Sequence, residues 1–168
     1  DLSIVKIDLD KNIRERFDSF YYFKKKKMVK KFLKPASKFS HKGTFGHVLI
    51  MGGSYGKIGA TVLSSLAALK TGSGLVTTYL PKCGYNIMQN SITEAMCITD
   101  PSEEYLSKAP DLNTYQAVAI GMGVGQHKET EKLMLKCLKD NPNQYFVIDA
   151  DALNILSKQK KPFQYVPK

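Results

Sequence analysis

Two glycine-rich segments and one pair of carboxylates are the residues of this sequence best suited to chemistry. Residues 52–60 read GGSYGKIGA, residues 121–125 read GMGVG, and residues 149–154 read DADALN. Glycine allows close approach of the backbone to a ligand, and the first turn of a helix presents unpaired N–H groups and a partial positive charge. Both glycine segments could therefore line an anionic or polar ligand. The first matches neither GxGxxG nor GxxxxGK[ST], so a purely structural turn stays open as an alternative.

The polar residues beside these segments have two interpretations each. Asp149 directly follows an apolar strand and needs a partner there, which favours a role in a site that holds a metal, a water or a ribose hydroxyl. Asp151 is equally placed to cap the next helix, and capping is the favoured interpretation. For His127 a solvated or capping role is favoured over catalysis, because no Ser or Cys nucleophile accompanies it at a recognised spacing.

Alternating strands and helices must position these segments. The pattern predicts strands over 47–51, 74–80, 94–99, 115–120 and 144–148, and helices over 58–71, 84–91, 102–108, 128–139 and 152–159. The strands are nearly continuous apolar runs, which predicts an α/β fold with a parallel sheet covered on both faces. In such sheets ligands bind beyond the carboxyl ends of the strands, so we expect chemistry in the loops after Met51, Ile120 and Ile148.

The charge of the chain is concentrated at its start. Of the formal +10, residues 1–42 carry +8, from thirteen basic and five acidic side chains, and this part predicts an edge strand over 2–9, a connector over 10–23 and a basic helix over 24–33. A solvated lysine face is favoured there over contact with nucleic acid or an anionic membrane. Three cysteines without ligand spacing indicate neither a disulfide framework nor a zinc site, and a reducing, cytoplasmic setting is expected. No apolar run approaches the roughly 20 residues that span a bilayer.

Five motifs taken in order define a resemblance to a known family. Two further motifs, HKGTFG at 41–46 and GSGLVT at 72–77, complete the set with the three segments above. In this order the five motifs closely resemble those of the ADP/ATP-dependent NAD(P)H-hydrate dehydratases of the ribokinase-like superfamily, over about residues 32–159. The resemblance implies a three-layer sandwich with a mainly parallel sheet. It also implies a lyase that uses ADP or ATP with Mg²⁺ to convert hydrated NADH or NADPH (NADHX, NADPHX) back to the working cofactor, in a homo-oligomer.

The same resemblance implies roles for particular positions. Ala60 and Gly125 match family positions that contact the hydrated dinucleotide, and Asp149 matches an acidic position near the phosphates or metal. The residues expected to shape the substrate pocket are Gly53, Gly56, Gly59 and Gly123.

Two departures from the family pattern qualify the resemblance. Met122 stands where the family usually has proline, and the family's nucleotide-binding and catalytic motifs, with the catalytic aspartate, are expected beyond residue 168. We therefore expect the sheet to be incomplete at its C-terminal side and the chain to be inactive alone. Residues 1–23 are interpreted as the tail of a preceding domain, such as an epimerase, and 24–168 as the N-terminal part of the dehydratase domain; the start at Asp1 fits a longer parent.

Three other functions remain as alternatives. A ribokinase-like kinase of a small alcohol or vitamin precursor shares the fold, but the motifs at 41–43 and 149–154 favour the dehydratase. A Rossmann dinucleotide-binding module predicts an acidic ribose ligand after the second strand, where the sequence instead reads TTYLP at 77–81. A nucleic-acid adaptor would depend on the lysines of 24–31, and its binding would disappear when that run is shortened.

Overall fold

A computed structural model describes residues 26–30 and 35–167. The chain divides into two compact units, residues 1–38 and 39–168, and the helix α1 (Lys26–Lys30) lies in the first. The strands of the second unit are β1 (His47–Met51), β2 (Leu75–Leu80), β3 (Met96–Thr99), β4 (Ala117–Ile120) and β5 (Tyr145–Ile148). Its helices are α2 (Ile58–Lys70), α3 (Tyr85–Ser91), α4 (Lys128–Asp140) and α5 (Asp151–Ser157), with short 3₁₀ helices η2 (Lys42–Phe45), η3 (Lys82–Gly84) and η4 (Pro162–Gln164).

The five strands form one parallel sheet in the order β3-β2-β1-β4-β5. β1 lies in the centre, where Leu49 pairs in register with Thr77 of β2 and Val118 of β4. The chain builds β2 and β3 on one side of β1 and then crosses back to place β4 and β5 on the other side. This reversal puts the carboxyl ends of β1 and β4 next to each other, at the place where open α/β sheets bind their ligands.

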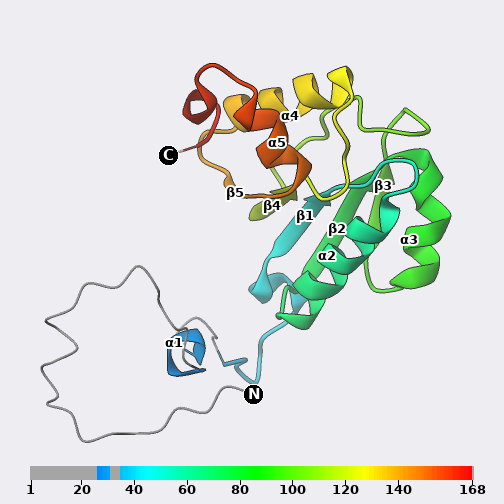
Figure 1. Ribbon diagram of the computed structural model, residues 1–168. Helices are drawn as coiled ribbons and strands as arrows, with labels where there is room; N and C mark the ends of the chain where they lie inside the picture. The colour runs from blue at the N-terminus through cyan, green and yellow to red at the C-terminus, as the bar shows by residue number, and fades with distance from the viewer. Residues whose placement is uncertain (1–25, 31–34, 168) are drawn as a thin grey trace, which may run out of the picture. The chain divides into compact units, whose positions relative to one another are not determined.

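Helices cover both faces of the sheet (Figure 1). On one face Ile50 and Val76 pack in a cluster with residues of α2 and α3, such as Met88. On the other face Leu49 and Val118 pack with residues of α4 and α5. The predicted α/β fold with a covered parallel sheet is thus confirmed. At the edge, Tyr145 and Val147 of β5 remain 80% and 61% exposed.

The helix expected over 102–108 is absent, because the carboxylate of Asp100 binds the backbone of this segment instead. Asp100 is fully buried after β3 and accepts hydrogen bonds from the amides of Ser102, Ser107 and Lys108 at 2.8, 2.8 and 3.0 Å. The Ser107 and Tyr79 hydroxyls donate to it at 2.6 and 2.9 Å. Because these amides donate to the Asp100 side chain, they do not donate to the backbone carbonyls of a regular helix.

The remaining predicted elements of the second unit are present with ends shifted by one or two residues. The strand expected over 2–9 and the connector over 10–23 lie outside the described residues. The basic helix expected over 24–33 is described only at Lys26–Lys30, which is helical. Within the part of the chain that the structure describes, no helix is long and apolar enough to cross a membrane.

Candidate functional site

The loops after β1, β4 and β5 meet at the carboxyl edge of the sheet because these strands are neighbours. The Gly53 amide donates to the Met122 carbonyl at 2.8 Å, and the Ser54 hydroxyl donates to the Gly123 carbonyl, also at 2.8 Å. Met122 accepts this bond through its backbone, which is available whatever the side chain. Hydrogen bonds thus join the two glycine segments directly.

Two glycines at this junction are required by its geometry. Gly53 has φ +81° and Gly123 has φ +69°, in the left-handed region that other residues rarely adopt. A Cβ on Gly123 would lie 2.7 Å from the Lys57 carbonyl oxygen and 3.1 Å from the Cβ of Ala60. The backbone after β4 therefore packs against the first turn of α2, and only glycine allows that distance.

The start of α2 is open to solvent on its outer side. Gly56 and Gly59 are exposed, and a Cβ on either would meet no atom within 4 Å. The N-cap residue, Lys57, makes no side-chain capping bond. Ala60 follows in the first turn and is half-buried beside Gly123. This arrangement leaves room for a ligand at the positive end of a 13-residue helix.

Thr61 places a buried hydroxyl beneath the first glycine segment. Its side chain is fully buried, and Oγ1 has no hydrogen-bond partner among the described residues. A Cβ on Gly52 would lie 2.6 Å from this oxygen, so the hydroxyl lies directly against the Gly52 backbone. Sequence reasoning missed Thr61, because an isolated Thr in an apolar helix carries no signal of its contacts.

Asp151 does not cap α5, so that expectation is wrong. The N-cap position is Ala150, and Asp151 is the first residue of the helix. Its Oδ2 accepts from the Gly125 amide at 2.9 Å and lies 3.9 Å from Lys57 Nζ. Oδ2 bonds to the β4 loop because the sheet order brings the Gly125 amide within reach, and Oδ1 accepts from the Asn154 side chain of the same helix.

Asp149 is exposed at the end of β5, and its backbone amide donates to the Ile120 carbonyl at 3.1 Å. No group of three or more His, Cys, Asp or Glu side chains is placed to hold a metal ion within residues 26–30 and 35–167. Asp149 thus presents a single exposed carboxylate on the same edge as the glycine segments.

His127 caps α4, as the sequence predicts. Its Nδ1 accepts from the Glu129 amide at 3.3 Å, and its ring stacks on Tyr105 with centroids 3.8 Å apart. Both contacts give the imidazole a local structural role.

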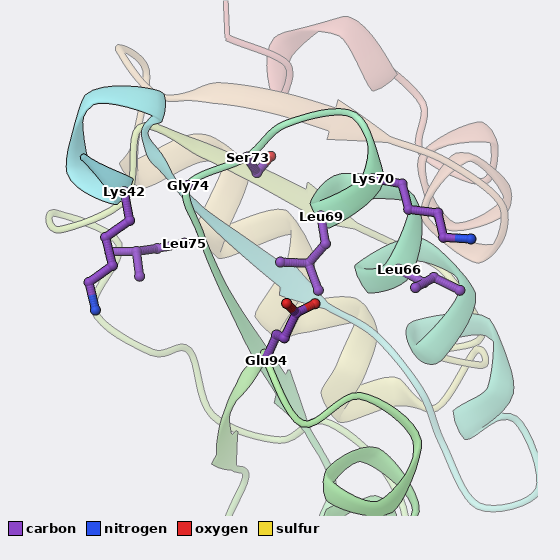
Figure 2. Close-up of a pocket in the computed structure, with 8 residues that line it drawn as sticks. All are labelled: Lys42, Leu66, Leu69, Lys70, Ser73, Gly74, Leu75 and Glu94. Atoms are coloured by element: carbon purple, nitrogen blue, oxygen red, sulfur yellow. The ribbon is translucent and has the colours of Figure 1, made fainter. Parts of the chain in front are cut away.

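The two remaining motifs lie at the opposite, amino edge of the sheet. His41 caps η2 just before β1. Gly74 lies just before β2, and its backbone packs so tightly that a Cβ there would clash with the Lys42 carbonyl. Figure 2 shows the hollow beside this contact, with Lys42 on one side and Lys70 and Glu94 on others. HKGTFG and GSGLVT therefore close the amino edge and supply no residue to the three loops.

Comparisons with known proteins identify similar sequences and similar folds. The family model described as NAD(P)H-hydrate dehydratase matches residues 48–168. A Streptococcus thermophilus protein named ADP-dependent (S)-NAD(P)H-hydrate dehydratase is 30% identical over 138 residues, which cover 80% of this chain and 48% of that protein. A Coxiella burnetii protein named bifunctional NAD(P)H-hydrate repair enzyme Nnr is 37% identical over 120 residues, covering 71% of this chain and 24% of its own length.

Solved structures of similar proteins have the same fold. The ADP/ATP-dependent NAD(P)H-hydrate dehydratase of Bacillus subtilis, crystallised with ATP and Mg²⁺, superposes with a TM-score of 0.65 at 26% identity, over 76% of this chain and 45% of that one. A ribokinase-like protein of Enterococcus faecalis shares the fold with a TM-score of 0.69 at 20% identity, over 84% and 51% of the two chains.

The parallel sheet with its carboxyl-edge loops thus defines an α/β protein that shares its fold with the ribokinase-like protein of Enterococcus faecalis and the Bacillus subtilis dehydratase. Within that class, the chain belongs to the NAD(P)H-hydrate dehydratase family. It spans about half the length of the curated dehydratases it matches. The names of these relatives do not favour the alternative of a kinase for a small alcohol.

Proposed function

We propose that the protein containing this chain uses ADP or ATP to dehydrate NADHX and NADPHX, and so repairs damaged nicotinamide cofactors. The observation that carries the proposal is the direct hydrogen bonding between the two glycine segments at the point where strand order reverses. Relatives named as ADP-dependent dehydratases and repair enzymes support it.

The proposed dinucleotide site is centred on Ala60 and Gly125. They lie on segments that the Gly53–Met122 and Ser54–Gly123 hydrogen bonds hold together. A side chain larger than methyl at position 60 would press on the backbone of Gly123. In this site Gly53 and Gly123 shape the turns, while Gly56 and Gly59 leave the helix start open for the anionic part of the dinucleotide.

The proposed chemistry converts a poor leaving group into a good one. A phosphoryl group passes from the nucleotide to the hydroxyl that hydration added, and loss of phosphate with a ring proton restores the double bond of the reduced nicotinamide. Because the chain spans about half of its dehydratase relatives, we propose that residues outside residues 1–168 supply most of the nucleotide site and the catalytic aspartate.

Mg²⁺ would neutralise charge on the transferred phosphoryl group. Asp149 is the residue proposed to lie near it, because its exposed carboxylate stands on the same edge as the glycine segments. One carboxylate suits Mg²⁺, which is commonly held by one or two carboxylates together with substrate phosphates and water. A cytoplasmic location and a homo-oligomeric assembly are proposed with this function.

The test is the recovery of reduced-nicotinamide absorbance from NADHX or NADPHX with ADP or ATP, measured on the complete product of the gene. We expect recovery that requires the nucleotide. Ala60→Val should raise KM for the hydrated dinucleotide about tenfold, since the added methyls crowd Gly123. Ala67→Val, on the exposed side of the same helix, should leave KM unchanged. Absence of recovery in the complete product would overturn the proposal and bring the kinase alternative forward.

A further inference from the structure

One carboxylate, that of Asp151, connects all three loops of the carboxyl edge. It belongs to the segment after β5, accepts from the Gly125 amide of the β4 loop at 2.9 Å, and faces Lys57 Nζ of the β1 loop at 3.9 Å. Its second oxygen accepts from Asn154 Nδ2 at 3.4 Å. The Asp151 side chain is only 18% exposed, although its partner Lys57 is 55% exposed.

The residue before Asp151 has a strained backbone conformation, which accompanies the position of the Asp151 carboxylate. Ala150 has φ +48° and ψ −120°, and it is the one described residue other than glycine with positive φ. Such a conformation is unfavourable for a residue with a Cβ and persists where surrounding contacts enforce it. Here the Asp151 amide donates to the Gly121 carbonyl at 3.2 Å, so the strained turn also fixes the segment against the β4 loop.

Lys57 is the third member of this arrangement, and its ammonium group can still donate hydrogen bonds to another anion. Its side chain is 55% exposed, and a separation of 3.9 Å to Asp151 exceeds the usual length of a charge-assisted hydrogen bond. The ammonium group is therefore held near the start of α2 by attraction and keeps donors for another anion. In the chain, Lys57 follows the exposed Gly56, where a Cβ would meet no atom within 4 Å, and directly precedes the first turn of α2.

We propose that Asp151 is a positioning residue of the dinucleotide site, which fixes the Gly125 amide and holds the Lys57 ammonium for contact with a phosphate of the bound dinucleotide. The inference rests on the proposed function and adds two residues to it. Asp151 acts through Gly125 and Lys57, and its carboxylate does not itself touch the substrate.

The experiment uses kinetics of the complete gene product with NADHX at saturating nucleotide. Asp151→Asn keeps an acceptor for the Gly125 amide but removes the charge that holds Lys57, so it should raise KM about fivefold with little change in kcat. Lys57→Met should raise KM by a similar factor, and the double variant should be no worse than either single one. Asp151→Ala, which also frees the Gly125 amide, should show the largest rise in KM.

Matched controls separate positioning from folding. Asp140→Asn and Lys136→Met change exposed residues of α4 and should leave KM unchanged. A structural role alone would lower the active fraction, which reduces kcat at constant KM, and that result for Asp151→Asn would overturn the inference. If the complete product fails to dehydrate NADHX, the proposed function is wrong. Calorimetric binding of NADPH then decides the inference: weaker binding by Asp151→Asn supports it, and equal or absent binding overturns it.

Discussion

The two edges of the sheet differ in how they use glycine. At the amino edge Gly74 allows two backbone segments to touch, because a Cβ there would clash with the Lys42 carbonyl. At the carboxyl edge Gly56 and Gly59 border empty space, where a Cβ would meet nothing within 4 Å. Gly74 at the amino edge serves close packing, whereas the carboxyl edge combines close packing at Gly123 with backbone that stays accessible at Gly56 and Gly59. The same residue type in one family's motifs can therefore mark either packing or binding.

His41 at the amino edge and two polar side chains at the carboxyl edge differ in how far along the sequence their hydrogen bonds reach. At the amino edge His41 bonds within its own turn, where Nδ1 accepts from the Gly43 amide at 3.2 Å. At the carboxyl edge Ser54 and Asp151 bond to loops that follow other strands, at 2.8 and 2.9 Å. Contacts between loops fix the relative positions of segments far apart in sequence, which a binding site requires.

The largest effect on stability is expected from adding a side chain at the amino edge, where two backbone segments touch. Gly74→Ala should lower the free energy of unfolding by about 4 kcal/mol, since the added methyl would overlap a backbone carbonyl that cannot rotate away. Urea denaturation would measure it. The folded fraction should bind NADPH as the wild type does, and a specific loss of affinity would remove the distinction between the edges.

Asp100 shows that the carboxyl edge is not uniformly a binding surface. Burial alone would raise the pKa of Asp100, but bonds from the Ser107 hydroxyl and from the amides of Lys108, Ser102 and Ser107 outweigh it and hold the pKa below its usual value. A depressed pKa in the folded state stabilises the protein above the unfolded pKa of about 4. This stabilisation is lost as pH falls through the folded value.

Asp100→Asn should therefore cost about 3 kcal/mol at neutral pH and flatten the acid limb of the stability profile. Denaturation between neutral pH and about pH 3 would test this. The proposed dehydration activity, measured on the complete gene product, should remain. A steep acid limb that is unchanged in the variant would show that other carboxylates cause it.

Gly56→Ala tests the open edge with a smaller change. At φ +79° and with no neighbour within 4 Å, the cost is conformational only, about 1 kcal/mol of unfolding free energy. Because the loop borders the proposed site, KM for NADHX should rise although stability barely changes. An unchanged KM would indicate that the space beside Gly56 is not used by the dinucleotide.

The smallest effect is expected in the core between the edges, at Cys137 of α4. Burial, followed by repulsion from Asp140, raises the pKa of this thiol to about 11. A raised thiol pKa favours the folded state below the unfolded pKa of about 8.5, and this contribution declines as pH rises toward the folded value. Iodoacetamide at pH 8 should leave Cys137 unmodified, and mass spectrometry would check this. Modification of Cys137 at pH 8 would mean that α4 opens readily.

The α/β fold could be predicted because it depends on local patterns, whereas the meeting of the loops depends on the order of the strands. Apolar runs such as Val48–Met51 define parallel strands, and the glycine segments at their carboxyl ends mark the loops. The helix expected over 102–108 failed because Asp100 binds amides two to eight residues away. Local propensity cannot show which backbone groups a buried carboxylate will satisfy.

The sequence by itself determined the family, the parallel sheet and the edge that carries the glycine segments, since each follows from residue type and spacing along the chain. Tertiary structure alone decided that Asp151 bonds to Gly125 instead of capping its own helix. It also decided that Thr61 lies beneath Gly52. These contacts depend on the order of strands in the sheet, because only that order brings residues 26 positions apart, such as Gly125 and Asp151, within hydrogen-bonding distance.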